Sequence, residues 1–96
     1  MAAIEYLQNQ NWRILFHDVK IFGIQIDILA RDTSGVLHLL EVKSEAAGDL
    51  GGVGFRQLAR LCRVAGFLSE FEPCVLQIVL VEPGRFEFLP VDGLTD

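Results

Sequence analysis

Apolar and polar positions along this chain follow two periods, one typical of strands and one of a helix. Residues 26–30 and 37–43 are short apolar segments rich in leucine, isoleucine and valine, and they predict strands. Residues 75–81 form a continuous apolar run that predicts a buried strand, and a Pro-Gly turn leads from it into a short edge strand at 85–89. Between residues 54 and 70 the apolar positions recur at helical spacing, which predicts an amphipathic helix.

The first two of these strands are joined by residues 32–35, a polar segment that ends in glycine and favours a hairpin. If the turn is centred on residue 34, Asp27 lies directly opposite Glu41, and opposed residues have Cβ atoms about 5 Å apart. Lys43 shares a face with Glu41, because every second side chain of a strand points the same way. Two carboxylates and one ammonium group are therefore expected to converge.

Such a patch contains the ligand types that Mg²⁺ and Mn²⁺ prefer. Asp27 and Glu41 offer hard oxygen ligands, and the main-chain carbonyl of Val42 is placed to be a third, with waters completing the shell. A metal ion there would acidify a water and neutralise charge on a phosphate, while Lys43 steadies the nucleophile or the developing negative charge. The pattern predicts phosphodiester hydrolysis. The alternative is an ordinary ion pair between Lys43 and a carboxylate on a half-exposed sheet.

The position of Glu41 within its strand favours the functional interpretation. Leu37 and Leu39 share its face, while His38 and Leu40 lie on the other, so the strand is largely apolar on both faces until it reaches Glu41. A strand covered on both sides belongs in the middle of a sheet, where charged groups are costly to bury unless they are paired or bind a metal.

The order of elements and the motifs together resemble the PD-(D/E)xK nuclease superfamily. Within it they resemble the YraN-like family, small bacterial proteins related to archaeal Holliday-junction resolvases. The resemblance runs from about Ala3 to Leu68. Residues 3–15 resemble the opening helix and first strand, residues 23–32 a Gly-Glu-Ile-Asp-Leu-Ile-Ala-Arg-Asp stretch, and residues 40–43 a Phe-Val-Glu-Val-Lys segment.

This resemblance implies an α/β fold with a restriction-endonuclease-like core, a mixed central sheet flanked by helices in the order αβββαβ(β). It implies a Mg²⁺- or Mn²⁺-dependent endonuclease acting on DNA, with branched DNA as one substrate and a homodimer as the assembly. Asp27, Glu41 and Lys43 match the family motif residue by residue. Gln57, on the predicted helix, corresponds to a Gln or Lys that often reaches the site in the superfamily, and it is a candidate to hold a water or the phosphate. The alternative is a polar residue at the boundary between the basic and the apolar face of that helix.

Three departures from the family pattern leave other interpretations open. A glutamate on the family's first helix would fall before Met1, and Glu5 has a different helical phase. Gln25 replaces a carboxylate two residues before Asp27, and neutral or acidic residues follow Lys43 where the family is basic. The chain is therefore also compatible with a catalytically silent nuclease-fold domain that binds nucleic acid or a protein partner, or with an unrelated α/β domain that carries a chance motif.

Composition and charge set the remaining bounds. With 96 residues, 51% of them hydrophobic, residues 1–96 are expected to form one domain with a single core. The chain shows neither a membrane-spanning run nor a signal peptide, which predicts a cytoplasmic protein with no membrane partner. The net charge of −5 disfavours nucleic-acid binding. Arg56, Arg60 and Arg63 nevertheless recur on one face of the predicted helix and are candidate phosphate contacts, or else an ordinary solvated face.

The other reactive and aromatic residues are expected to be structural. Ser44 only turns or caps the chain after Lys43, and the glycine-rich segment 48–54 is expected to form a loop at the mouth of the site. The two cysteines and two histidines lack the spacing of a metal site or disulfide framework, so the cysteines are expected to be small buried residues. The core or an interface, rather than base stacking, is the expected role of the larger aromatic residues Trp12, Phe16, Phe22, Phe67 and Phe71.

Overall fold

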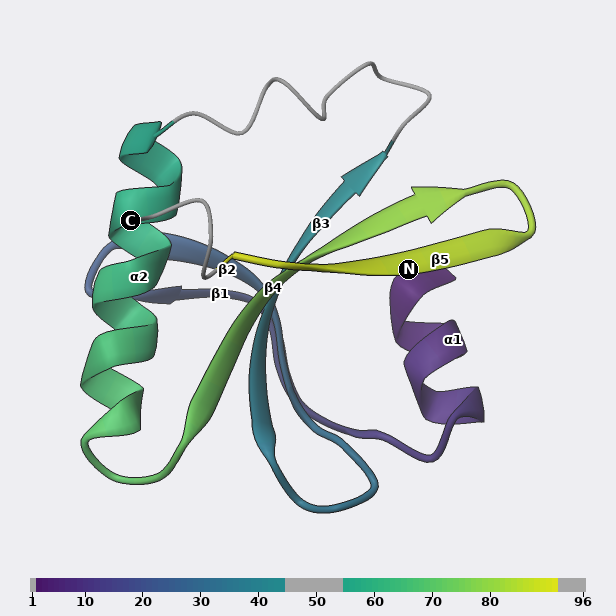
Figure 1. Cartoon of the computed structure of the whole chain (residues 1–96), viewed down its shortest axis with the longest axis horizontal. Coiled ribbons are helices and arrows are strands. Elements are labelled where there is room, and N and C mark those ends of the chain that lie inside the picture. The colour runs from purple at the N-terminus through teal and green to yellow at the C-terminus, as the bar shows by residue number, and fades with distance from the viewer. Residues whose placement is uncertain (1, 45–54, 92–96) are drawn as a thin grey trace.

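The computed structural model describes residues 2–44 and 55–91, which form two helices and five strands (Figure 1). The order αβββαββ confirms the α/β fold class predicted from the sequence. The elements are α1 (Ala2–Asn9), β1 (Arg13–Ile21), β2 (Ile24–Arg31), β3 (Leu37–Ser44), α2 (Phe55–Ser69), β4 (Cys74–Glu82) and β5 (Arg85–Pro90).

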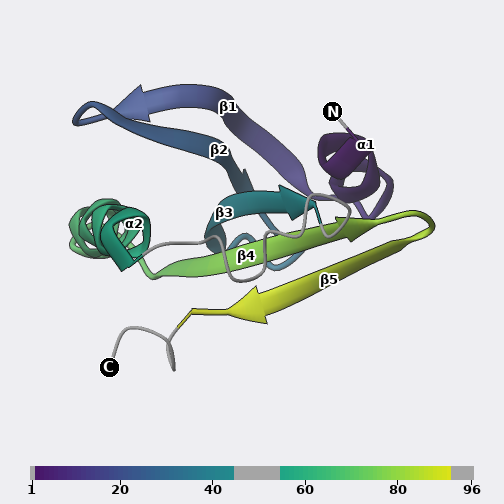
Figure 2. The ribbon, with the colours of Figure 1, turned by 90° about the horizontal axis from the view of Figure 1, so that it is seen from above.

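All five strands form one mixed sheet in the order β1-β2-β3-β4-β5 (Figure 2). Neighbouring strands are antiparallel except β3 and β4, which are parallel and are connected through α2. Strand β3 is therefore the central strand, and its residues 37–41 are all buried. This confirms that the strand is covered on both faces up to Glu41, and it places that carboxylate at the point where burial begins to decrease along β3.

Each face of the sheet carries its own hydrophobic core because the side chains of β3 and β4 alternate between the two helices. On one face, Leu39 and Ile78 pack with the buried residues of α2. On the other face, their neighbours Leu40 and Val79 pack with the buried residues of α1. The buried helix residues are Leu58, Leu61, Val64 and Ala65 from α2, and Ala3 and Leu7 from α1. Glu41 and Lys43, in phase with Leu39, lie on the α2 face.

The sequence predicted the core or an interface for four phenylalanines, and their exposure excludes the core. Phe16 and Phe22 are 56% and 70% exposed, and Phe67 and Phe71 are 40% and 74% exposed. Position explains the difference: Phe22 lies in the β1–β2 turn, and Phe67 and Phe71 lie at and just beyond the exposed carboxyl end of α2. Trp12 does pack inside, where its ring lies 4.6 Å from that of His38.

Cys62 and Cys74 are free thiols that pack against the core but are only partly buried, so they are less buried than the sequence predicted. Burial raises the pKa of the Cys74 thiol, which makes it less reactive. In the part of the chain that the structure describes, neither helix is both long and apolar enough to cross a membrane. The predicted loop over 48–54 lies outside the described residues.

Candidate metal site on the central strands

The β2–β3 turn sets the register that brings the candidate residues together. The turn closes with a hydrogen bond from the Gly35 amide to the Asp32 carbonyl, 2.9 Å, and Gly35 has a φ of 86°. Pairing then runs back to Ile28 opposite Leu40. Asp27 and Glu41 are the next residues on the two strands, just beyond this last paired position and in the register that the sequence predicted. The carboxylate Oδ2 of Asp27 accepts a 2.8 Å hydrogen bond from the main-chain amide of Val42.

Glu41 is a buried acid whose charge is incompletely matched. Its side chain is 6% exposed, and its Oε1 lies 3.8 Å from Nζ of Lys43. Its Oε2 is buried and has no hydrogen-bond partner, and among the described residues no other buried side-chain oxygen or nitrogen is in this state. An unsatisfied buried oxygen is costly, so it points to a ligand that would complete the site.

The electrostatics of Glu41 show which groups face it. Burial, followed by the nearby Asp27 carboxylate, raises the pKa of Glu41 from 4.5 to about 7. The charge of Lys43 and a hydrogen bond from the Gln57 side chain act in the opposite direction on that pKa. The structure therefore brings all four candidate residues together: Asp27 from β2, Glu41 and Lys43 from β3, and Gln57 from α2.

The third oxygen ligand expected from the sequence is the carbonyl of Val42. In a strand, the N–H and C=O of one residue face the same neighbouring strand. Because the Val42 amide donates to Asp27, its carbonyl is directed toward the Asp27 side as well. Two carboxylates, this carbonyl and waters suit Mg²⁺, which keeps several waters and needs few protein ligands.

Further carboxylates do not join this group. Within residues 2–44 and 55–91, no three His, Cys, Asp or Glu side chains gather as a metal-binding cluster. Glu5 is exposed on α1 and is not among the groups that shift the pKa of Glu41. Ser44 is exposed at the end of β3. The residues therefore fit a hydrated divalent ion rather than a closed protein cage.

The three predicted phosphate-contacting arginines lie on the solvent side of α2. Arg56, Arg60 and Arg63 are all exposed, and none of them forms an ion pair with another described residue. Arg60 also lines a pocket of about 390 Å³ between α2 and the end of the β1–β2 hairpin. The other lining residues are Lys20, Gly23, Ile24, Gln25 and Gln57.

The sequence analysis missed Lys20 and Gln25 as candidate site residues. They reach the pocket because the β1–β2 hairpin curves toward α2, so that its turn lies beside the helix in both ribbon views. The one available signal was Gly23, which marks the tight turn between two apolar runs. The curvature itself depends on packing and is not readable from local sequence.

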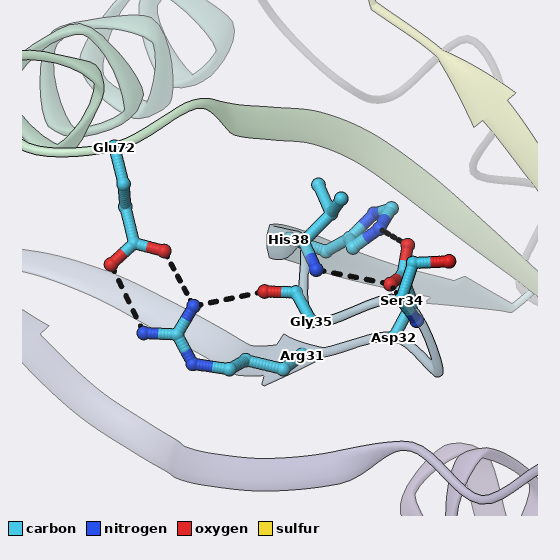
Figure 3. Close-up of polar contacts among 7 residues, drawn as sticks. Arg31, Asp32, Ser34, Gly35, His38 and Glu72 are labelled. Carbon is cyan, nitrogen blue, oxygen red and sulfur yellow. Dashed lines mark hydrogen bonds and ion pairs between the residues drawn. The ribbon is translucent and has the colours of Figure 1, made fainter.

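The opposite end of the β2–β3 hairpin shows the reverse situation, because its charged side chains Arg31 and Asp32 each have a partner (Figure 3). Arg31 forms a two-pronged ion pair with Glu72, with one contact at 3.0 Å, and also donates to the Gly35 carbonyl. The buried His38 ring contacts Asp32 and Gln77, each at 2.8 Å. This agrees with the structural role expected for His38.

These contacts shift two acidic groups in the direction opposite to Glu41. The hydrogen bond with His38 is the main cause that lowers the pKa of Asp32, with smaller contributions from the main-chain amides of Val36 and Ser34. The hydrogen bond with Arg31 likewise lowers the pKa of Glu72. Both carboxylates are therefore stabilised in their charged forms.

Comparison with known proteins places the chain in a family. The model of the family described as "Uncharacterised protein family UPF0102" matches residues 1–90. A UPF0102 protein of Symbiobacterium thermophilum is 37% identical over 92 residues, covering 86% of this chain and 77% of the relative. A UPF0102 protein of Cupriavidus metallidurans is 27% identical over 95 residues, covering 91% of this chain and 71% of the relative. The chain with this pair of opposed carboxylates on its central strands belongs to the uncharacterised protein family UPF0102.

Proposed function

We propose that this protein is a Mg²⁺- or Mn²⁺-dependent nuclease of the PD-(D/E)xK type that hydrolyses phosphodiester bonds in DNA. One observation carries the proposal: Oε2 of the buried Glu41 lacks a partner while the carboxylate of Asp27 lies close by. The Asp27 carboxylate makes ionisation of the buried Glu41 more costly, and a cation bound by both side chains would remove that cost. The matching motif residues Asp27, Glu41 and Lys43 support this proposal.

In this account each side chain has a distinct task. A bound divalent ion supplies Lewis-acid stabilisation and an acidified water. Asp27 and Glu41 hold the ion, and the hydrogen bond from the Val42 amide fixes the orientation of Asp27. Lys43, 3.8 Å from Glu41, carries the positive charge that stabilises the developing negative charge on the phosphate. Gln57 orients a water or a phosphate oxygen from the α2 side.

The acidic composition of the chain opposes DNA binding. The chain carries a net charge of −5, so nonspecific attraction of duplex DNA is weak. Three arginines of α2, none of which is paired with an acid among the described residues, concentrate positive charge on the helix that carries Gln57. Local charge rather than net charge governs the contact with a phosphate, because surface charges beyond a Debye length of about 8–10 Å are largely screened.

The test combines metal binding with cleavage in the same protein samples. Mn²⁺ is titrated calorimetrically into the wild type and into an Asp27→Ala/Glu41→Ala double variant, and branched and linear DNA are incubated with each. We expect the wild type to bind Mn²⁺ and to cleave DNA only with metal, and the double variant to do neither. The matched control is Asp32→Asn, which changes an acid at the other end of the same hairpin and is expected to leave both properties intact.

Absence of Mn²⁺ binding at millimolar concentrations in a folded wild type would contradict the proposal. The chain would then be a catalytically silent domain, in which Lys43 alone neutralises Glu41. Sedimentation velocity on the same samples tests the homodimer that the proposed relation to resolvases implies, since two sites must act on two strands.

A further inference from the structure

Three phenylalanine rings form an exposed cluster where the β1–β2 turn meets the carboxyl end of α2. The edge of Phe22 meets Phe67 with ring centroids 5.0 Å apart, and Phe67 meets Phe71 at 5.3 Å. Phe22 and Phe71 are 70% and 74% exposed, so the rings contact one another more than they contact the core. Clustered exposed aromatic rings on a soluble surface usually mark a binding site.

The backbone at Phe22 strengthens this interpretation. Phe22 and Gly23 are the two residues between the paired Ile21 and Ile24, and both have positive φ, 53° and 74°. Such a two-residue turn favours Asn-Gly, and a bulky residue is strained in its first position. Phe22 is thus unfavourable for the turn and buries little of its ring, so neither folding requirement explains it. Strain retained at an exposed aromatic residue points to function.

The aromatic cluster (Phe22, Phe67 and Phe71) continues a line of cationic groups. On α2, Arg56, Arg60, Arg63 and Phe67 follow one another at spacings of three or four residues, which is one helix face. Across from this face, Lys20 and Gln25 of the hairpin complete the 390 Å³ pocket with Arg60 and Gln57. Gln57 also acts on the pKa of Glu41, and Gly23 follows Phe22 in the chain, so the pocket is bordered by a candidate catalytic residue and by the turn that carries Phe22.

The length of this track suits a few nucleotides. From Gln57 to Phe67 the helix rises ten residues, about 15 Å at 1.5 Å per residue. Along that distance, the positively charged Arg60 and Arg63 come first and the aromatic ring of Phe67 comes last. Proteins that bind unpaired nucleic acid combine these two features, with cations along the backbone and rings that stack on successive bases.

We propose that this track holds an unpaired nucleic-acid strand, with Lys20 and Arg60 on its phosphates and Phe22, Phe67 and Phe71 stacked against its bases. This proposal rests on the proposed nuclease activity and names its substrate class, which is DNA with unpaired nucleotides next to the cleaved bond. Duplex DNA keeps its bases stacked internally and would leave the rings unused. With a net charge of −5, the protein needs stacking to supplement the few phosphate contacts.

The test measures binding without cleavage. Fluorescence anisotropy is recorded in EDTA for a labelled 12-nucleotide single strand and for the 12-base-pair duplex of the same sequence, using an Asp27→Asn background. We expect the single strand to bind at least about tenfold more tightly. Phe22→Asn and Phe71→Ala are each expected to weaken single-strand binding about five- to a hundredfold. Arg60→Gln should lower the slope of log Kd against log salt by about 0.7.

Two controls separate recognition from folding. Phe22→Asn places a favoured residue in the turn, so the melting temperature is expected to stay within about 5 °C of the parent or to rise while binding falls. Phe16→Ala removes a phenylalanine of comparable exposure that has no ring contact with the aromatic cluster, and it should leave binding unchanged.

Specific outcomes overturn the proposal. Equal affinity for single strand and duplex, or equal effects of Phe16→Ala and Phe71→Ala, would contradict it. So would a Phe71→Ala variant that changes a dimer into a monomer and binds DNA as before, because the aromatic cluster would then join two copies of the chain. Metal-dependent cleavage without any preference for unpaired strands would support the nuclease proposal and contradict the proposal of single-strand binding. Single-strand binding through the aromatic cluster without cleavage would contradict the nuclease proposal alone.

Discussion

The two ends of the β2–β3 hairpin treat buried polar groups in opposite ways. At the turn end, His38 has a partner on each ring nitrogen, and the Asp32 carboxylate is held in its charged form. At the open end, Asp27 and Glu41 lie together and one oxygen of Glu41 is unpaired. The same two strands thus carry a hydrogen-bonded polar network at one end and a carboxylate pair with an unpaired oxygen at the other. We expect the network to stabilise the fold, and the carboxylate pair to destabilise it unless a ligand binds there.

The largest expected effect is on DNA cleavage, which substitutions at the open end of the β2–β3 hairpin should reduce and a substitution at its turn end should not. Asp27→Asn or Glu41→Gln should reduce metal-dependent DNA cleavage at least about 100-fold, because each removes a proposed metal ligand. Asp32→Asn should change the cleavage rate less than about twofold. Initial rates at saturating Mn²⁺ measure this, and a comparable loss in Asp32→Asn would erase the distinction between the two ends.

The next effect separates them by stability. His38→Ala removes a buried ring that packs against Trp12 at a tilt of 50° and leaves Asp32 and Gln77 without their partner. We expect a loss of about 2–3 kcal/mol in the free energy of unfolding, or roughly 10–20 °C in melting temperature. Glu41→Gln should not lower the melting temperature of the metal-free protein at pH 8. Thermal denaturation followed by circular dichroism tests both variants, and greater destabilisation by Glu41→Gln would contradict the account.

The pH dependence of stability should have opposite signs at the two ends. Glu41 has its pKa raised from 4.5 to about 7, so its contribution is full below about pH 4.5 and is lost as the pH rises through 7. Asp32 has its pKa lowered from 3.8, so its contribution is present above that pH and is lost as the pH falls through the lowered value.

Urea denaturation in EDTA between pH 3 and pH 8 measures this difference. As the pH rises from 5 to 8, the free energy of unfolding of Glu41→Gln should increase relative to that of the wild type. Asp32→Asn should be less stable than the wild type at neutral pH, and this difference should disappear only below about pH 4. Adding Mn²⁺ at pH 8 should stabilise the wild type but not Glu41→Gln. Parallel profiles for the wild type and Glu41→Gln would show that the pKa of Glu41 is not raised.

The smallest expected effect concerns the ion pair between Arg31 and Glu72. Its side chains are 32% and 40% exposed, so solvent screens the interaction despite its two-pronged geometry. Glu72→Gln should shift the melting temperature by a few degrees at most, and 0.5 M NaCl should reduce that shift. Arg85→Gln on the exposed strand β5 is the matched control, and its effect should be similar or smaller.

Local sequence predicted the parts of the site that depend on register. The polar segment 32–35 fixes the hairpin, and strand alternation then places Asp27 opposite Glu41 with Lys43 on the same face. The helical period likewise placed the three arginines on the exposed side of α2. These features depend on residues near one another in sequence or on a single period.

The parts that the sequence did not predict depend on the path of the whole sheet. The sequence predicted the core or an interface for Phe22, as for the other large aromatic residues, and phenylalanine is among the residues most often buried. Its exposure, and the approach of Lys20 and Gln25 to Arg60, result from how the β1–β2 hairpin curves beside α2. Sheet twist and curvature arise from the packing of all five strands, so no short segment encodes them.

The most direct test of an unmatched carboxylate pair built for a cation is the anomalous diffraction of crystals grown with Mn²⁺. The account predicts one strong manganese peak roughly 2.0–2.3 Å from carboxylate oxygens of both Asp27 and Glu41, with the Val42 carbonyl in the same shell. Crystals grown at millimolar Mn²⁺ that show no manganese peak between Asp27 and Glu41, and in which Glu41 is still paired with Lys43, would contradict the account.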